Sequence, residues 1–269
     1  METTTKFLKV SLIIPVFNSF KYVDLICKSI GANENSIEEI IFVNDGGSVS
    51  DFQQLVESIK NRFQNVKYFS YEQNEGPWKA RNIAVANASQ DIIAFYDTDD
   101  LLPSNSIFSR VKLLDENSTA KFVCSSYRWL IDGEEKGMNH VLQKFGKSEL
   151  LQTCFVCTPS VVMRRSVFNE AGGFRKIGAE DFDLWIRILS GPGSYALGDT
   201  SSHVLITSNR NSVSSNKLRS ARWYFAILKM NEKRKPVQVL FFFIYFLNVL
   251  LRRYLKIKTR PLVIRSTIK

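Results

Sequence analysis

One short stretch, Ile92 to Asp100, constrains the fold more than any other part of this sequence. Its first five residues, Ile-Ile-Ala-Phe-Tyr, are all apolar, which is typical of a central strand covered by helices on both faces. Asp97, Asp99 and Asp100 follow at once. Carboxylates inside such a strand would be severely desolvated, so we expect them to emerge at its carboxyl end. In open α/β sheets this is the edge where ligands bind.

Three carboxylates at one strand end predict a cation site. Hard oxygen ligands suit Mg²⁺ or Mn²⁺, and an ion held by only one or two carboxylates keeps positions free for a substrate diphosphate. The same residues, followed by Leu-Leu-Pro, could form a solvated turn, because Asp starts turns and caps helices well. The surrounding sequence has to decide between the two interpretations.

The segments before this stretch alternate between strand-like and helix-like patterns. We expect strands at 7–17, 39–43 and 66–71, and helices at 22–30, 49–63 and 77–87. Strands that alternate with helices of this length predict an α/β fold with a parallel, doubly wound sheet. Residues 1–100 therefore form a nucleotide-type half, although no G-x-G-x-x-G phosphate turn is present.

The pattern is mixed beyond Asp100. We expect helices at 101–114 and 182–189, strands at 121–129 and 159–164, and a hairpin turn at Asp132-Gly133. This second half is predicted to continue the same sheet. It is not expected to form a separate domain.

The charge of the chain points to an anionic partner. Lys and Arg number 36 against 26 for Asp and Glu, which gives a net charge of +10. A nucleotide, a nucleic acid or an acidic membrane surface would fit such an excess. No nucleic-acid-binding module is recognisable, so we expect no nucleic-acid partner.

The cysteines are predicted to be buried thiols in a reducing cytoplasm. Four are scattered through the chain, at Cys27, Cys124, Cys154 and Cys157, and no secretory signal precedes the first strand-like run. The last two have a redox or zinc spacing, but their segment is apolar and no second pair lies nearby in sequence. Two histidines are too few for a histidine-based metal site.

An apolar run from Val237 to Leu251 lies near the end of the chain, with basic residues on both sides. It is shorter than the roughly 20 residues that span a bilayer. We expect it to lie in the interface of a membrane, held by its apolar side and by basic residues that meet anionic lipid. A core or dimer-interface helix is the alternative.

Polar residues follow three of the predicted strands and would line one crevice. Asn18 follows the first strand and Asp45 the second. Asp45 could accept hydrogen bonds from a base or a ribose, or could simply start the turn at Gly46-Gly47. Arg81, in the first turns of a helix, could meet a diphosphate in bidentate geometry or be a solvated helix residue.

The motifs together resemble family 2 glycosyltransferases of the GT-A fold. Five of them occur in the family's order: Ser11-Leu-Ile-Ile-Pro-Val-Phe-Asn18, Val43-Asn-Asp45-Gly, Asn74-x-Gly76-x-x-x-Ala80-Arg81-Asn82, Asp97-x-Asp99-Asp100 and Glu180-Asp181. Their joint occurrence, over roughly residues 8–215, is far more specific than any one motif. The resemblance implies a GT-A domain at 1–215, with a nucleotide-binding half at 1–100 and an acceptor half at 101–215. A helical basic and apolar tail at 216–269 would follow it.

The resemblance also implies roles for residues of the first half. Pro15, Phe17 and Asn18 would border the nucleoside of the donor. Asp45 would hold its base or ribose, and Arg81 would face its phosphates.

The carboxylates of the last two motifs would carry the metal and the chemistry. Asp97 and Asp99 match the family's D-x-D, with Asp99 on Mn²⁺ or Mg²⁺, Asp97 on the ribose or the metal, and Asp100 in support. Asp181 matches the catalytic base. Independently, an acceptor hydroxyl that attacks an anomeric carbon needs a base within hydrogen-bond reach. A helix N-cap is the alternative role for Asp181.

One position departs from the family. A strand near 204–214 often ends there in a histidine that assists the metal or the diphosphate, whereas Asn209 stands at that place. Arg210 or His203 could substitute for it.

These predictions describe an inverting, metal-dependent glycosyltransferase of the hexosyltransferase class. It would move a sugar from a nucleotide-diphosphate sugar, with UDP preferred, to a hydroxyl of a saccharide or lipid-linked saccharide. The expected setting is the assembly of bacterial surface polysaccharide such as O-antigen, capsule or lipopolysaccharide. The enzyme would be cytoplasmic and peripheral at the inner face of the cell membrane.

Two alternatives are weighed against this prediction. A catalytically inactive, membrane-bound nucleotide-sugar-binding protein would not need the intact Asp99 and Asp181. A sugar-phosphate nucleotidyltransferase would need a glycine-rich phosphate loop after the first strand, where this chain has Pro15-Val-Phe-Asn18.

Overall fold

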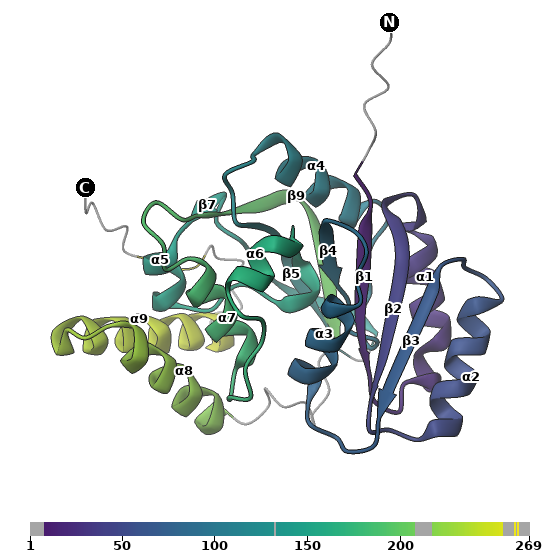
Figure 1. Ribbon diagram of the computed structural model, residues 1–269. Coiled ribbons are helices and arrows are strands. Elements are labelled where there is room, and N and C mark those ends of the chain that lie inside the picture. The colour runs from purple at the N-terminus through teal and green to yellow at the C-terminus, as the bar shows by residue number, and fades with distance from the viewer. Residues whose placement is uncertain (1–7, 132, 208–216, 255–260, 262, 264–269) are drawn as a thin grey trace, which may run out of the picture.

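A single mixed β-sheet runs through the molecule, with helices on both faces (Figure 1). The computed structural model describes residues 8–131, 133–207, 217–254, 261 and 263. Its strand order is β3-β2-β1-β4-β8-β5-β9-β7, and β6 pairs with β5 outside this path. The α/β fold class predicted from the sequence is confirmed.

The first half of the chain builds the parallel part of the sheet. Its strands are β1 (Val10–Val16), β2 (Ile37–Asp45), β3 (Val66–Tyr71) and β4 (Ile92–Phe95). The helices between them are α1 (Val23–Gly31), α2 (Val49–Lys60) and α3 (Pro77–Ala86), with short 3₁₀ turns at Phe20–Tyr22 and Glu34–Ser36. Parallel pairing of β1 with both β2 and β4 brings three strand ends to one edge.

Helices cover both faces of this part because its strands are apolar on both faces. Leu12 and Ile14 of β1 pack into a core with α1 and α2, whereas Ile13 packs into the opposite core with α3. All three side chains are fully buried. The uninterrupted apolar runs of the sequence therefore correspond to strands between two helical layers.

The second half continues the sheet, as predicted. Its strands are β5 (Phe122–Ile131), β6 (Glu134–Asn139), β7 (Lys144–Phe145), β8 (Val161–Arg164) and β9 (Ala196–Thr207). Its helices are α4 (Ser106–Glu116), α5 (Lys147–Gln152), α6 (Arg165–Glu170) and α7 (Glu180–Ile188), with a 3₁₀ turn at Thr158–Ser160. Strand β8 lies antiparallel between β4 and β5, so it joins the two halves into one sheet.

One predicted helix begins later than expected. The sequence pattern indicates a helix from 101, but α4 begins at Ser106. Leu101 instead exchanges two backbone hydrogen bonds with Leu205 of β9, at 2.9 and 3.0 Å. This bridge fixes the segment after Asp100 against the second half of the sheet.

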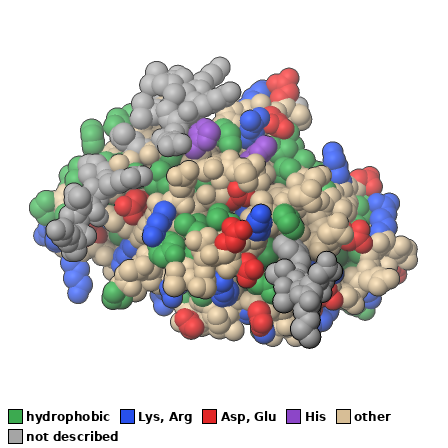
Figure 2. Space-filling model, turned by 90° about the horizontal axis from the view of Figure 1, so that it is seen from above, with side chains coloured by type: hydrophobic (Ala, Val, Ile, Leu, Met, Phe, Trp, Pro, Cys, Tyr) green, Lys and Arg blue, Asp and Glu red, His purple; other side chains and the backbone are tan. Residues whose placement is uncertain are grey.

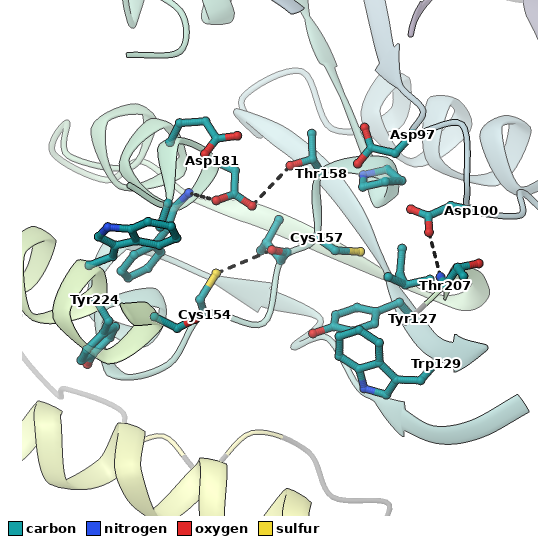
Figure 3. Close-up of a pocket in the computed structure, with 18 of the residues that line it drawn as sticks. Asp97, Asp100, Tyr127, Trp129, Cys154, Cys157, Thr158, Asp181, Thr207 and Tyr224 are labelled. Carbon is teal, nitrogen blue, oxygen red and sulfur yellow. Dashed lines mark hydrogen bonds between the residues drawn. The ribbon is translucent and has the colours of Figure 1, made fainter. Parts of the chain in front are cut away.

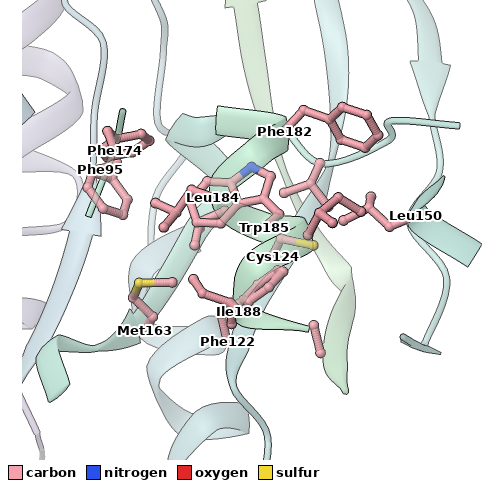
Figure 4. Close-up of a cluster of buried hydrophobic side chains, with 14 of the residues drawn as sticks. Phe95, Phe122, Cys124, Leu150, Met163, Phe174, Phe182, Leu184, Trp185 and Ile188 are labelled. Carbon is pink, nitrogen blue, oxygen red and sulfur yellow. The ribbon is translucent and has the colours of Figure 1, made fainter. Parts of the chain in front are cut away.

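Aromatic side chains fill the core between the sheet and α7 (Figure 4). Trp185 of α7 is fully buried, and its ring centroid lies 5.3 Å from that of Phe122 and 6.3 Å from that of Phe95. Phe174 packs edge-on against Phe95 with centroids 5.6 Å apart. The helix that carries Glu180 and Asp181 is thus anchored on β4, the strand that precedes the turn at Asp97.

Two further helices, α8 (Lys217–Asn231) and α9 (Lys235–Tyr254), lie side by side beyond α5 and α7 (Figure 1). Tyr224 of α8 stacks on Phe182 of α7 with centroids 5.8 Å apart, and on Tyr245 of α9 with centroids 4.0 Å apart. The apolar run predicted at 237–251 falls within α9. Within the described ranges, no helix has the length and apolar character to cross a membrane.

Candidate functional site

Asp45 closes the carboxyl end of β2 and is 3% exposed. Its Oδ1 accepts hydrogen bonds from the Tyr71 hydroxyl (2.7 Å) and from the backbone N–H groups of Glu75 (2.8 Å) and Gly76 (3.2 Å). Burial and the Asp45 carboxylate raise the pKa of Tyr71 above its usual value. Gly76 has φ of +101°, which an L side chain rarely adopts. Asp45 therefore holds the loop that precedes α3.

The residues predicted to border a nucleoside lie at the end of β1. Pro15 is half-buried within the strand, and the Phe17 side chain is 52% exposed. Asn18 has φ of +50°, and its Oδ1 accepts a hydrogen bond from the Ser48 N–H at 2.8 Å. The end of β1 is therefore tied to the loop after β2, beside Asp45.

The turn from Asp97 to Asp100 is rigidly held. The Asp100 N–H donates to the Asp97 carbonyl (3.0 Å), and the Tyr96 hydroxyl donates to the Asp100 carbonyl (3.0 Å). Asp100 is 3% exposed, and its Oδ1 accepts from the Thr207 N–H of β9 at 2.8 Å. Asp100 thus ties the turn to the end of β9.

Burial raises the pKa of Asp99, and the neighbouring Asp97 raises it further. The pKa of Asp100 is raised well above its usual range by burial and by both neighbouring aspartates. Three carboxylates in one turn repel one another, so a bound cation would stabilise their charged forms.

Arg81 connects this turn to the start of α7. It is 5% exposed; its Nη2 donates to Asp97 Oδ1 at 2.7 Å and its Nη1 to Glu180 Oε1 at 3.3 Å. Burial lowers the pKa of Arg81, but the two carboxylates outweigh burial and the net pKa is raised. The Arg81 Nε has no hydrogen-bond partner among the described residues. The guanidinium therefore joins the two acidic motifs.

Two hydrogen bonds of the neighbouring Asn82 side chain help to hold Arg81 in place. Asn82, the next residue of α3, accepts from the Phe174 N–H (2.9 Å) and donates to the Phe174 carbonyl (2.8 Å). The guanidinium carbon of Arg81 lies 5.4 Å from the centre of the Phe174 ring. The preceding Gly173 has φ of +67°, and a Cβ there would press on Asn82. The Gly172-Gly173-Phe174 motif therefore supports the Arg81 guanidinium.

Asp181 lies in the first turn of α7. The helix is preceded by Ala179, which has a left-handed backbone conformation (φ +56°). Asp181 Oδ1 accepts from the Phe182 N–H at 2.7 Å and its Oδ2 from the Thr158 hydroxyl at 3.4 Å. Burial raises the pKa of Asp181, an effect only partly offset by these hydrogen bonds and by Arg81. A carboxylate with a raised pKa at the rim of a cavity is suited to accept a proton.

A pocket of about 440 Å³ opens in front of these carboxylates. In Figure 3, Asp181 lies between Tyr224 on one side and Thr158 and Asp97 on the other, with Tyr127 and Trp129 nearer to Asp100. Arg81 and Glu180 also line it. The pocket thus brings the two acidic motifs, which lie far apart in sequence, to one cavity with aromatic walls.

Asp97 and Asp99 are the residues here that could hold a divalent ion. Two carboxylate ligands at a strand end fit Mg²⁺ or Mn²⁺, which take oxygen ligands and keep positions for substrate phosphates. Among the described residues, no group of three His, Cys, Asp or Glu side chains is arranged to hold a metal by itself. Asn209 and Arg210 lie outside the described residues, and His203 is on β9, its pKa lowered by burial and by Arg128.

Several features of the pocket were not predicted from the sequence. Thr158 as a partner of Asp181, and Glu180 as a partner of Arg81, come from contacts between distant segments. Cys27 and Cys124 are buried as expected, but Cys154 and Cys157 are half-buried and line the pocket. Burial raises the pKa of Cys157 to about 12, so its thiol is not ionised at neutral pH.

The excess of positive charge does not form one continuous basic patch on the face shown in Figure 2. Figure 2 shows Lys and Arg side chains interspersed there with Asp and Glu.

Comparison with known proteins identifies relatives of this chain. The sequence profile described as Glycosyl transferase family 2 matches residues 11–172. A protein of Rickettsia bellii described as an uncharacterized glycosyltransferase is 33% identical over 187 residues, which cover 68% of this chain and 26% of that protein. This chain thus spans about a quarter of that relative's length.

Two further proteins are similar over most of this chain. An Escherichia coli protein, the UDP-Glc:alpha-D-GlcNAc-diphosphoundecaprenol beta-1,3-glucosyltransferase WfgD, is 25% identical over 219 residues, or 81% of this chain and 85% of that protein. The crystal structure of Staphylococcus aureus TarS 1–349 in complex with UDP-GlcNAc matches with a TM-score of 0.67 at 18% identity, covering 91% of this chain and 73% of that one. The similarity to TarS is therefore a similarity of fold.

Proposed function

Because this chain belongs to glycosyltransferase family 2, we propose that it is an inverting, metal-dependent glycosyltransferase. It moves a sugar from a nucleotide-diphosphate sugar, with UDP as the nucleotide, to a hydroxyl of a saccharide or lipid-linked saccharide. The UDP preference is supported by the UDP-glucose named for the E. coli relative and the UDP-GlcNAc named for the TarS complex.

One observation carries this proposal. The guanidinium of Arg81 donates to Asp97 in the turn after β4 and to Glu180 at the start of α7. A single buried cation therefore holds the predicted donor-binding turn beside the predicted base, Asp181. Transfer of a sugar requires this proximity, because the acceptor oxygen must reach the anomeric carbon while the diphosphate departs.

The donor would lie along the ends of β1, β2 and β4. Pro15, Phe17 and Asn18 border its nucleoside, and Asp45 holds the base or ribose. Asp99, with Asp97, would hold Mn²⁺ or Mg²⁺, and such an ion would supply positive charge for the diphosphate.

Arg81 has a more specific role in this proposal than direct contact with the phosphates. Both ends of its fork already donate to carboxylates at 2.7 and 3.3 Å. Its positive charge still acts over a short distance on a diphosphate bound beside Asp97. Arg81 thus orients Asp97 and Glu180 and adds positive charge to the site.

Asp181 acts as the base of a single displacement. The acceptor oxygen forms its bond to the anomeric carbon as the bond from that carbon to the diphosphate oxygen breaks. The proton of the acceptor hydroxyl passes to Asp181, and the bonding electron pair leaves with the nucleoside diphosphate. Attack from the face opposite the leaving group inverts the anomeric configuration.

The setting we propose is the assembly of bacterial surface polysaccharide at the cytoplasmic face of the membrane. The diphosphoundecaprenol acceptor named for the E. coli relative supports a lipid-linked substrate. Apolar side chains of α9 are exposed, including Val239 at 70% and Phe243 at 59%, and Lys233, Arg234 and Lys235 precede them. Such a helix suits the surface of an anionic membrane.

The proposed function divides the chain into three segments. Residues 1–100 bind the nucleotide, residues 101–215 face the acceptor, and 216–269 form the basic, apolar tail. The boundary at 215 and 216 falls outside the described residues.

The test is turnover of nucleotide sugars. Release of nucleoside diphosphate is measured with UDP-glucose, UDP-GlcNAc and GDP-mannose, Mn²⁺ and short saccharide acceptors, and NMR follows the anomeric configuration of the product. We expect a UDP-sugar to react with inversion, and Asp181→Asn to slow the reaction by about 10² to 10⁴. Retention of configuration would contradict the proposed displacement, and full activity of Asp181→Asn would exclude Asp181 as the base.

A further inference from the structure

The last residues of β2 and β3 stand opposite each other in the sheet. Asp45 pairs with Tyr71 in the parallel register of these two strands, which lie side by side in Figure 1. The Tyr71 hydroxyl donates to Asp45 Oδ1 at 2.7 Å. Burial and the Asp45 carboxylate raise the pKa of Tyr71, so its hydroxyl keeps its proton at neutral pH. Tyr71 is therefore a permanent hydrogen-bond donor to one oxygen of Asp45.

The two oxygens of the Asp45 carboxylate have different surroundings. Oδ1 accepts three hydrogen bonds, from the Tyr71 hydroxyl and from the N–H groups of Glu75 and Gly76. A carboxylate oxygen has about two lone-pair sites, so Oδ1 has no capacity for a further donor. Oδ2 accepts no hydrogen bond from the described residues, and it is not closed off from solvent. Oδ2 is therefore open to a ligand.

The loop before α3 covers the side of the carboxylate that carries Oδ1. Gly46 has φ of +67°, and a Cβ atom there would overlap the backbone nitrogen of Asn74. The loop can approach the end of β2 so closely because position 46 is a glycine. Asn74 also donates from its side chain to the Asp45 carbonyl at 3.0 Å. A ligand therefore meets the carboxylate at Oδ2.

A carboxylate with one free oxygen distinguishes between nucleobases. Uracil offers a single imide N–H, at N3, which one oxygen can accept. Guanine offers two parallel N–H groups, from N1 and from its exocyclic amine, and needs both carboxylate oxygens to pair with them. Cytosine has an acceptor nitrogen in place of the imide, which a carboxylate oxygen repels. Because Oδ1 is filled, Asp45 favours uracil over the other two bases.

We infer that Tyr71 is a specificity-determining residue of the donor site: its hydroxyl fixes Oδ1 of Asp45, so that Oδ2 accepts the imide N–H of uracil. This role rests on the proposed function and deepens it, because it gives the UDP preference a cause in the chain's own residues. Tyr71 is a positioning residue, since it acts on the base through Asp45 and does not touch the nucleotide itself.

Equilibrium binding of four nucleotides to the full chain tests this assignment. Isothermal titration calorimetry in the presence of Mn²⁺ gives the Kd of UDP, CDP, GDP and 3-methyl-UDP, in which a methyl group replaces the imide hydrogen. We expect UDP to bind about tenfold more tightly than each of the other three. Equal Kd values for UDP and 3-methyl-UDP would overturn the role of the imide and leave the proposed transferase standing. Failure of all four nucleotides to bind would overturn the proposed function as well.

The variant Tyr71→Phe isolates the hydroxyl, because it keeps the aromatic ring. The Kd of UDP should rise about tenfold, whereas the Kd of GDP should stay the same, so the preference for UDP over GDP shrinks. The Kd of 3-methyl-UDP should also stay the same, since the hydrogen bond that Tyr71 supports is already absent there. Unchanged binding of these two nucleotides would also show that the variant is folded.

A matched control lies on the same strand. Tyr68→Phe makes the same chemical change at a side chain that is 51% exposed, and it should bind all four nucleotides like the wild type. Two results would overturn the inference. One is an equal loss of affinity for UDP, GDP and 3-methyl-UDP in Tyr71→Phe, which would indicate a purely structural role. The other is a Tyr71→Phe variant that binds UDP as tightly as the wild type.

Discussion

Arg81 donates to Asp97 across 2.7 Å, although its guanidinium is almost fully buried. This ion pair joins α3 to the turn after β4, and its second branch to Glu180 joins both to α7. One buried cation thus links the two acidic motifs of the site.

Substitution of Arg81 should therefore destabilise the fold strongly. Arg81→Met leaves two partly buried carboxylates without their partner, and we expect it to lower the free energy of unfolding by about 3 kcal/mol at neutral pH. Arg81→Lys keeps the positive charge but cannot donate to both carboxylates as a guanidinium does, so its loss of stability should be smaller. Urea denaturation gives both values. Lys112→Met, which breaks an exposed pair with Glu116, is the control and should unfold like the wild type.

Asp181→Asn should remove catalysis and keep binding. The amide can still accept from the Phe182 N–H, so the helix start is preserved, but it cannot take the acceptor proton. We expect kcat to fall by about 10² to 10⁴, with the affinity for UDP unchanged. Glu180→Gln should instead keep most of the catalysis and lower stability, since Glu180 acts through Arg81. Equal losses of kcat in the two variants would contradict this assignment.

The pH dependence of the rate should reflect burial of Asp181. The base acts in its charged form, and burial raises its pKa. Activity is therefore lost as the pH falls through a value above that of an ordinary aspartate, about 3.9. The hydrogen bond from Thr158 lowers this pKa, so Thr158→Val should move the acidic limb of kcat to higher pH. A limb that moves to lower pH would contradict the bond's proposed effect.

Glu39 should make stability depend on pH in acid. Burial raises its pKa, but hydrogen bonds from Lys67, Ser11 and Ser89 outweigh burial and lower it from 4.5 to about 2. The folded state thus holds the charged form more tightly than the unfolded state. This stabilisation is fully present above 4.5 and is lost as the pH falls from 4.5 to about 2.

The variant Glu39→Gln isolates this effect. It should be less stable than the wild type by about 2 kcal/mol at neutral pH, and the difference should shrink below pH 4.5. Chemical denaturation at several pH values measures it. A difference that stays constant down to pH 2 would mean that the charge of Glu39 is not its source.

The parallel half of the fold could be predicted from local patterns alone. The apolar runs at β1 and β4 lack the alternation of a sheet with one solvent-exposed face, so they predicted helices on both faces. Alternating strands and helices then gave the doubly wound order. The bounds of β3, 66–71, agree with the pattern, because turn residues limit this strand at both ends.

The second half could be predicted only in part. Nothing local indicates that β8 inserts antiparallel between β4 and β5, since this depends on pairing between segments far apart in sequence. Leu101 likewise fits a helical pattern, but its backbone pairs with Leu205. Tertiary pairing outweighed local periodicity at both places.

The candidate site shows the same division. The strand pattern predicted that Asp45 and Asp97 would lie at one edge, because the carboxyl ends of parallel strands share an edge, and the resemblance to the family implied that Asp181 would join them. Neither could predict that Arg81 pairs with Glu180, 99 residues away, or that Trp223 contacts Gly178. Side chains that meet across distant helices leave no periodic signal in the sequence.

The most direct test of the account is thermal unfolding of the protein with UDP, GDP and other nucleotides, in the presence and absence of Mn²⁺. A ligand that binds only the folded state raises the midpoint. We predict a rise with UDP that requires Mn²⁺ and disappears in Asp99→Ala. No rise with any nucleotide, or an equal rise in Asp99→Ala, would contradict a metal-dependent nucleotide-sugar site at the end of β4.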